Sequence, residues 1–263
     1  MELNIFVVDA FTDQQFKGNS AAVVPVENWL PDELMQSIAA ENNLSETAFL
    51  KRISGNQYEI RWFSPITEID FCGHATLASA HVLFFEFGLE KEIEFITSKV
   101  GSLSVILNEQ GDIEMTFPCQ KPELVSVIPE QLLAGLSKEP VEVLKNRQAY
   151  FAVMSTEQDV LDLAYDSVLL KKLAPLDVVV TSKSSQYDFV SRYFWPANGG
   201  DEDPVTGSIH AGLAPYWAEK LDKDGLVAYQ ASKRGGVLNC VVLDKNIIVS
   251  GQSVLYLKGK INV

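Results

Sequence analysis

Two stretches of the chain contain no Asp, Glu, Lys or Arg, and they predict its central elements. They cover residues 72–85 and 205–218. A helix that is apolar on every face is usually buried, so each stretch predicts a helix in a core. We expect the first helix at about 76–87, with Gly88 as its C-cap. The second is expected to kink at Pro215.

Runs of β-branched and aromatic residues surround both stretches and predict strands. Residues 58–63 alternate polar and apolar side chains as a strand does, and Pro65 ends the run. We expect strands at 3–8, 21–26, 44–50, 58–63, 93–97, 102–107, 113–117, 147–154, 177–182 and 189–194, and more between 226 and about 261. Two further helices are expected at 31–41 and 157–173.

The order of these elements repeats, and short blocks of sequence repeat with it. Residues 61–65 (RWFSP) return as 192–196 (RYFWP), and Gly73 and Gly207 lie 134 positions apart. The same offset of 134 relates Phe95, Ser98, Lys99 and Gly101 to Tyr229, Ser232, Lys233 and Gly235. Self-similarity at a long period is informative about architecture. We infer two related halves joined near 118–122, each a strongly bent sheet around one buried helix.

Helix N-termini carry unpaired N–H groups and a partial positive charge. If the two halves face each other, the helix starts at Gly73 and Gly207 can point into one cleft. Both would then attract one anionic group. The repeat therefore predicts a cleft that takes a small carboxylate.

Composition narrows the classes of partner. The net charge is −14, with 21 Lys and Arg against 35 Asp and Glu, which argues against general binding to nucleic acid or to an anionic membrane surface. A small anionic substrate needs only a local positive field. The three cysteines suggest no disulfide framework and favour the cytoplasm. The uncharged runs are too broken to predict a membrane span.

Several polar residues in apolar or glycine-rich surroundings are candidates for chemistry. Burial would raise the pKa of a carboxylate such as Glu46, which suits an acid/base near neutral pH. His74 stands at the first helix start and could relay a proton, while Asp203 and Ser208 flank Gly207. Each also has an ordinary structural explanation, as a solvated glutamate, a hydrogen-bonded histidine or an N-cap aspartate.

Metal and cofactor motifs are not evident in the sequence. The other histidines, His81 and His210, have no metal-ligand spacing to Cys or Asp residues. Cys72 has no obvious adjacent base that would make it a nucleophile. The glycine pairs at 199–200 and 235–236 do not lie between a strand and a helix as a dinucleotide loop must. We therefore expect neither a metal nor an organic cofactor.

Six blocks of sequence together resemble the PhzF-like (phenazine biosynthesis protein) family, within the wider diaminopimelate-epimerase-like fold. They are VDAFT at 8–12, FKGNSAAV at 16–23, NLSETAF at 43–49, RWFSP at 61–65, EIDFCGHATLA at 68–78 and EDPVTGS at 202–208. The family commonly has proline where this chain has Ser20, a change in a loop. The resemblance spans nearly the full length.

The resemblance implies an α+β fold of two pseudo-symmetric lobes, each a curved, mostly antiparallel sheet around a central helix. The lobes are expected at 1–118 and 119–254, with the strand at about 255–263 packing on the first lobe and the active site between the lobes. It also implies a homodimer and a cofactor-free isomerase that moves a proton.

The resemblance carries roles onto particular residues. It implies that Glu46 is the catalytic acid/base and that His74, Asp203 and Ser208 complete the catalytic set by holding the substrate. The backbone N–H groups of Gly73 and Gly207 are expected to bind the substrate's carboxylate. The same motifs place Asn19 and Thr206 in the substrate-binding site.

Two other functions stay open at this stage. Epimerases of the wider fold use two opposed cysteines; Cys72 matches the first, and we expect Pro204 at the second position, so a cysteine-based racemase is disfavoured. A small-ligand-binding protein that retained the cleft but lost its chemistry is the other alternative, because a fold does not fix a function. The substrate and the pathway are not predicted.

Overall fold

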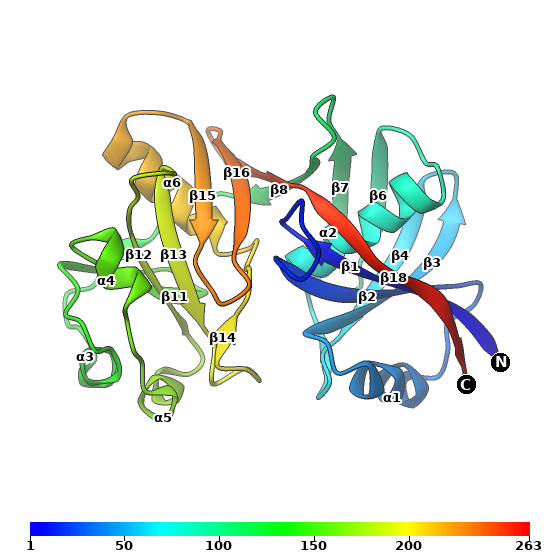
Figure 1. The fold of residues 1–263 in the computed structure, drawn as a ribbon, viewed down its shortest axis with the longest axis horizontal. Coiled ribbons are helices and arrows are strands. Elements are labelled where there is room, and N and C mark those ends of the chain that lie inside the picture. The colour runs from blue at the N-terminus through cyan, green and yellow to red at the C-terminus, as the bar shows by residue number, and fades with distance from the viewer. The chain divides into compact units, whose positions relative to one another are not determined.

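The computed structural model describes all 263 residues as two compact units (Figure 1). The first unit comprises Met1–Thr116 and Ser250–Val263, and the second comprises Phe117–Val249. Both consist mainly of strands, with few helices. The α+β class expected from the sequence is therefore confirmed.

The first unit is a mixed, mostly antiparallel sheet. Its strands are β1 (Glu2–Ala10), β2 (Asn19–Val26), β3 (Glu46–Ser54), β4 (Gln57–Phe63), β5 (Glu68–Ile69), β6 (Glu92–Ile96), β7 (Ser102–Leu107) and β18 (Ser253–Asn262), and β8 (Ile113–Pro118) begins in it. The order is β18–β1–β2–β3–β4–β6–β7–β8, with β2–β3 and β4–β6 parallel. The short β5 pairs with the end of β4.

The second unit repeats this pattern of pairing. Its strands are β9 (Glu123–Leu124), β10 (Glu142–Lys145), β11 (Ala149–Val153), β12 (Asp177–Lys183), β13 (Phe189–Phe194), β14 (Glu202–Asp203), β15 (Gly225–Gln230) and β16 (Gly236–Val242), and β17 (Asn246–Gly251) begins in it. β11–β12 and β13–β15 are parallel, as β2–β3 and β4–β6 are, and β14 pairs with the end of β13. Two related halves, inferred from the sequence repeat, are present in the strand topology.

Helix α2 (Gly73–His81) is the core helix of the first unit, and all nine of its residues are buried. It packs on β1, β2, β3 and β18. The hydroxyl groups of Thr76 and Ser79 donate to carbonyls one turn back in the chain, so neither is left unpaired. The helix begins at Gly73, three residues before the predicted start. A π-helical turn, Val82–Glu86, extends it towards Gly88, whose φ is +72°.

Helix α1 (Asp32–Asn42) packs on the other face of the same sheet. Met35 and Ile38 of α1 lie in one apolar cluster with Phe49 of β3, and α1 and α2 lie on opposite sides of β2 in Figure 1. Successive strand residues point to opposite faces, so Glu46, three positions before Phe49, faces α2. The sheet thereby directs Glu46 towards the start of the buried helix.

Helix α6 (His210–Leu221) is the corresponding helix of the second unit. Its residues from His210 to Ala218 are buried, and Pro215 lies inside it. The helix begins three residues after Gly207, because a turn over Gly207–Ile209 precedes it. A second apolar cluster, which includes Leu132, Val160, Leu170 and Phe194, forms another part of this unit's core.

The prediction of one long helix at 157–173 is wrong. The structure has α4 (Glu157–Leu161), α5 (Ser167–Leu170) and a 3₁₀ turn at Lys171–Leu173. Arg192 donates hydrogen bonds to the carbonyls of Val160 and Leu163. Between α4 and α5, Tyr165 forms an isolated β-bridge with Leu136, the residue that follows α3 (Glu130–Gly135). These contacts come from distant residues, so the amphipathic pattern alone could not reveal the break. The sequence analysis also missed α3, β9 and β10.

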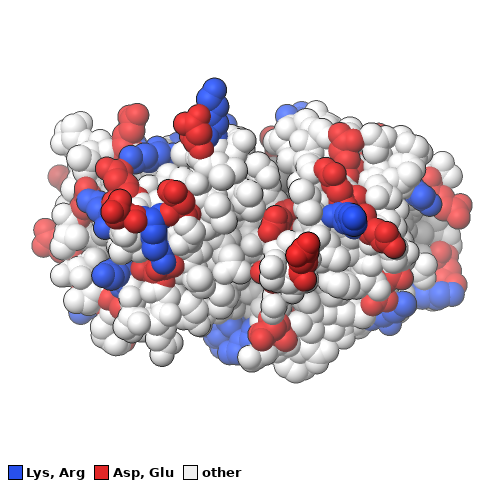
Figure 2. Space-filling model, turned by 90° about the horizontal axis from the view of Figure 1, so that it is seen from above, with Lys and Arg blue, Asp and Glu red and all other residues white.

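Charged side chains of both signs are intermingled over the face seen in Figure 2, with broad uncharged areas between them. No helix in the structure combines the length and the apolar character needed to cross a bilayer.

Candidate active site

Glu46, Cys72 and His74 converge in the first unit at the start of α2. Glu46 is the first residue of β3, Cys72 is the N-cap of α2 and His74 is the second residue of that helix. His74 Nε2 lies 2.8 Å from Glu46 Oε2, and Cys72 Sγ lies 3.4 Å from His74 Nδ1. All three side chains are buried. The sequence-predicted acid/base and the sequence-predicted histidine are therefore in contact.

The charges of this cluster are coupled. Burial lowers the pKa of His74, but the anionic forms of Cys72 and Glu46 beside it more than offset that effect, and the pKa of His74 is raised well above 6.5. Burial, reinforced by the Glu46 charge, raises the pKa of the Cys72 thiol to about 11. Cys72 is therefore a neutral thiol near pH 7.

Asn19 lies behind the imidazole. It is fully buried, its Nδ2 lies 3.1 Å from His74 Nδ1, and its Oδ1 accepts a hydrogen bond of 3.2 Å from Ser45. Since one amide atom contacts the ring nitrogen that does not face Glu46, Asn19 fixes the orientation of His74. Ser45 was not singled out in the sequence analysis, although it lies next to Glu46.

The chain just before Asn19 is held by Asp9, which the sequence analysis did not identify. The Asp9 carboxylate accepts hydrogen bonds from the Phe16 backbone N–H, at 2.9 Å, and from the Ser20 hydroxyl. Gly18 has φ +62°, and a Cβ added there would lie 2.1 Å from the carbonyl oxygen of Ala10. Only glycine fits this conformation and this space.

Asp203 and Thr206 lie together in the second unit. The Thr206 hydroxyl donates to Asp203 Oδ2, and both residues are buried. Gln230 joins them: its side-chain N–H group donates to the Asp203 carbonyl, and its oxygen accepts from the Thr206 backbone N–H, each at 2.9 Å. Gln230 is fully buried, and its hydrogen bonds stabilise the segment that precedes Gly207. Gln230 lies 24 residues after Thr206 in the sequence, so no local sequence pattern could identify it as a partner.

Ser208 ends a chain of hydrogen bonds that the sequence analysis also missed. Gln148 donates to the Ser208 oxygen at 2.9 Å and to the Tyr193 oxygen at 3.1 Å. Tyr193 donates to Asp177 at 2.5 Å. Burial and the neighbouring Asp177 charge raise the pKa of Tyr193 well above 10, and burial raises the pKa of Asp177. Tyr193 therefore remains a hydrogen-bond donor throughout the physiological range.

The structural repeat bears on the position expected for a second cysteine. β5 and β14 pair with the same positions of β4 and β13, so Glu68 corresponds to Glu202. At that offset of 134 the residue that matches Cys72 is Thr206, two positions after Pro204. Neither Pro204 nor Thr206 carries a thiol.

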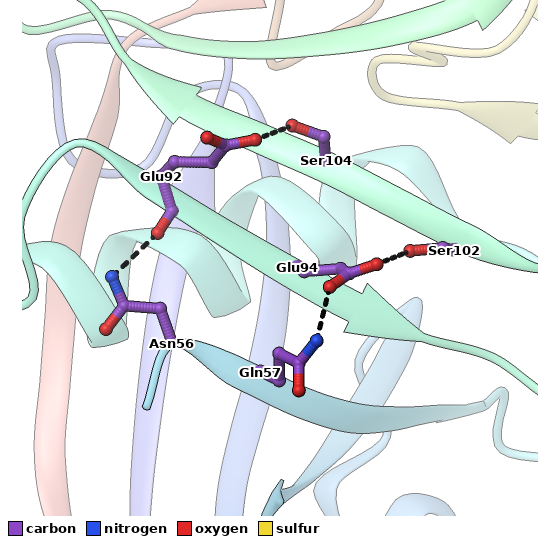
Figure 3. A pocket seen from close by; sticks show the side chains of 6 residues that line it. All are labelled: Asn56, Gln57, Glu92, Glu94, Ser102 and Ser104. Carbon is purple, nitrogen blue, oxygen red and sulfur yellow. Dashed lines mark hydrogen bonds between the residues drawn. The ribbon is translucent and has the colours of Figure 1, made fainter. Parts of the chain in front are cut away.

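The hollow in Figure 3 does not involve these residues. It measures about 540 Å³ and is lined by Asn56, Gln57, Glu92, Glu94, Ser102 and Ser104. Its carboxylates accept hydrogen bonds from serine and glutamine neighbours, for instance Ser104 to Glu92 at 2.7 Å. These side chains satisfy one another on the open face of the sheet. None of the predicted site residues lines the hollow.

A bent sheet around a buried helix, present twice, defines the class of the protein. A hydroxyproline epimerase from Agrobacterium vitis, whose structure was solved with bound trans-4-hydroxy-L-proline, superposes with a TM-score of 0.65. The match covers 99% of this chain and 92% of that chain at 10% sequence identity, so it shows the fold alone. The chain thus shares an α+β fold with this epimerase.

Sequence and structure comparisons then identify the family. The model of the "Phenazine biosynthesis-like protein" family matches residues 8–259. "Uncharacterized isomerase PA2770" of Pseudomonas aeruginosa is 46% identical over the whole of both chains. The crystal structure of a PhzF family protein of Enterococcus faecalis has a TM-score of 0.95 at 42% identity and covers both chains completely. The chain belongs to the PhzF family, and the resemblance drawn from its motifs is confirmed.

Proposed function

We propose that this protein is a cofactor-independent isomerase in which Glu46 moves a proton on a small carboxylic acid. Glu46 would take a proton from one carbon of the substrate and return it to another, so no oxidant or reductant is needed. The observation that carries the proposal is the buried contact of 2.8 Å between Glu46 and His74. The isomerase names of the relatives support the reaction class.

The surroundings of Glu46 suit a general base. The contact of 2.8 Å between Glu46 Oε2 and His74 Nε2 is not a well-aligned hydrogen bond, so a proton of the substrate can compete with the imidazole for that oxygen. A protonated His74 would stabilise the negative charge that develops on the substrate as the proton leaves. Glu46 and His74 lie at the starts of β3 and α2, which position their side chains.

The second unit would hold the substrate through Asp203, Thr206 and Ser208. Their positions are braced by Gln230 and Gln148. The first N–H groups of a helix or of the turn before it have no acceptor within the helix. Those at Gly73 and Gly207 are suited to the substrate's carboxylate.

The decisive variant is Glu46→Gln, which removes the base and nearly preserves its shape. General acid/base catalysis contributes about 100-fold or more to a rate, so turnover should fall at least by that factor while thermal stability and ligand binding stay close to the wild type. Glu41→Gln, on the exposed side of α1, is the matched control and should behave as wild type. Near-normal turnover of the Glu46 variant would contradict the proposal.

A ligand must be identified before turnover can be measured. A thermal-shift screen of small carboxylic and amino acids provides it, because a ligand at about 100 times its dissociation constant stabilises a protein by about 2.7 kcal/mol. Ligands found in this way are then incubated with enzyme in D₂O. Deuterium uptake at carbon by wild type, and none by Glu46→Gln, is the expected result. Binding without exchange across the panel would favour a ligand-binding protein.

A cysteine-based racemase receives little support. Cys72 is the single cysteine of the first unit, its thiol pKa is raised, and Thr206 stands at the corresponding position of the second unit. Cys240 is buried in β16, and burial raises the pKa of its thiol strongly.

A further inference from the structure

Trp62 of β4 carries a buried hydrogen-bond donor that has no acceptor in the protein. The side chain is 2% exposed, and its indole Nε1 makes no hydrogen bond. Native structures leave few buried polar groups unpaired, because each one costs free energy of folding. The indole of Trp217 is also buried, but it donates to the Thr181 hydroxyl at 2.9 Å. The unpaired N–H group of Trp62 therefore calls for an acceptor.

Trp62 lies on the face of the sheet that carries Glu46. Its neighbour Phe63 packs against Phe49 on the α1 side, with ring centroids 5.5 Å apart, so Trp62 points to the opposite face. In the ladder Trp62 is directly opposite Ala48 of β3, and Glu46 is two residues before Ala48 on the same face. Diagonal neighbours of this kind are within reach of an aromatic side chain.

A second contact places the indole beside the start of α2. The rings of Trp62 and Phe71 meet edge to face, with centroids 5.7 Å apart and planes at 74°. Phe71 directly precedes Cys72, the N-cap of α2. Trp62 therefore shares a sheet face with Glu46 and also contacts the segment that leads into the buried helix.

The second unit shows what a donor at this position can reach. In the repeated blocks RWFSP and RYFWP, Trp62 corresponds to Tyr193. Tyr193 donates at 2.5 Å to Asp177, which lies two residues before its direct partner in the ladder. Glu46 has the same relation to Trp62. The diagonal thus directs the donor towards the carboxylate, but in the first unit the N–H group does not bond to it.

We propose that the Trp62 indole N–H binds the substrate, by donating to an oxygen atom next to the carbon that Glu46 deprotonates. This role rests on the proposed function, in which the N–H groups at Gly73 and Gly207 take the carboxylate. The indole then takes a second oxygen, so the preferred substrates are acids that also carry a hydroxyl, oxo or second carboxylate group. A substrate without that oxygen leaves a buried donor unpaired, which gives strong discrimination.

The indole proton has its own NMR signal, which tests the contact without any activity assay. Protein labelled with ¹⁵N has four indole signals, because the chain has four tryptophans, and the spectrum of Trp62→Phe assigns one of them. Lactate, pyruvate and malonate carry a second oxygen acceptor, whereas propanoate is the acid of equal length without one. At least one of the first three should move the Trp62 proton downfield, as a new hydrogen bond does, and propanoate should not.

Dissociation constants for the same acids measure what the N–H group contributes. Trp62→Phe keeps an aromatic ring but loses the donor, so affinity for the acid that moves the signal should fall about 10-fold or more, while affinity for propanoate stays unchanged. Trp217→Phe is the matched control. It loses the internal hydrogen bond to Thr181 and should be less stable, but it should bind all four acids as wild type does. Urea denaturation verifies that both variants fold.

Three results would overturn the proposal: a Trp62 signal that none of the acids moves, a shift that propanoate produces equally, or equal losses of affinity for all acids in Trp62→Phe. The indole would then be a core side chain whose N–H group binds enclosed water. The two proposals fail separately. If the Trp62 signal moves as described but Glu46→Gln keeps its turnover, the donor stands and the base is wrong. If Glu46→Gln is inactive and the Trp62 signal does not move, the base stands and the donor is wrong.

Discussion

His210 links the stability of the second unit to pH. The imidazole is fully buried at the start of α6, and its Nδ1 lies 2.9 Å from the carbonyl oxygen of Thr206. A carbonyl can only accept, so Nδ1 carries the proton. Nε2 is buried without a hydrogen-bond partner and is the unprotonated nitrogen of a neutral ring. Burial lowers the pKa of His210 to about 4, although hydrogen bonds to backbone groups of Thr206 and Gly207 raise it slightly.

The sign and size of the effect follow from this pKa. The unfolded chain takes up the proton near pH 6.5 and the folded chain near pH 4, so between these values the unfolded state binds more protons. His210 therefore contributes no penalty above pH 6.5, and stability is lost as the pH falls towards 4. Between about pH 7 and pH 5 the free energy of unfolding should fall by about 2 kcal/mol because of this one residue.

Urea denaturation of wild type and His210→Asn at about pH 7 and pH 5 tests this prediction. Asparagine retains an N–H donor for the Thr206 carbonyl but does not titrate. The variant is expected to be less stable at both values, but to lose about 2 kcal/mol less than wild type on acidification. His81, whose pKa burial also lowers to about 4, should show its own increment in His81→Asn. An identical pH dependence in wild type and His210→Asn would refute the reasoning.

Two further pairs of substitutions probe contacts that shape the units. Gly18→Ala should destabilise the protein by more than 2 kcal/mol, because its Cβ would overlap the Ala10 carbonyl; Gly55→Ala, with φ +50° and open space around it, should cost only about 1–2 kcal/mol. Arg192→Met should cost about 3 kcal/mol, since it leaves the largely buried Glu202 without its partner. Arg61→Met, whose partners Glu68 and Asp32 are more exposed, should cost about 1 kcal/mol. Urea denaturation measures all four, and equal losses within either pair would contradict the structural reason given.

The sequence predicted most where the signal is local. Fourteen uncharged residues in succession indicate a buried helix whatever surrounds them, and α2 lies there. Gly88 stands where a helix must end with a positive φ, and its φ is +72°. The paired RWFSP and RYFWP blocks indicated two related halves because they recur in the same order as the predicted elements.

The site was less predictable because its contacts join distant parts of the chain. Asn19 meets His74 across 55 residues, and Gln148 meets Ser208 across 60. The sequence around a glutamine or asparagine does not show whether its side chain is buried and hydrogen-bonded to a site residue or exposed to solvent. The convergence of Cys72 with Glu46 likewise depends on how β3 packs against α2.

The internal repeat explains why one carboxylate, and not two, is the proposed base. Phe63 pairs with Thr47, and the equivalent Phe194 pairs with Val178. Glu46 comes just before Thr47 and Asp177 just before Val178, so Asp177 is the counterpart of Glu46. The two carboxylates have different surroundings. Glu46 contacts an imidazole that can be charged, whereas Asp177 accepts hydrogen bonds from Tyr193 and Asn198.

Those surroundings assign different tasks to the two carboxylates. Both oxygens of Asp177 are engaged by uncharged donors, and through Tyr193 and Gln148 they fix the Ser208 hydroxyl. A carboxylate occupied in this way positions a neighbour and is poorly placed to accept a proton from carbon. Glu46 keeps an oxygen without a well-aligned hydrogen bond. Under the proposed mechanism the two units share a fold but differ in chemistry: the first would move the proton, and the second would orient the groups that hold the substrate.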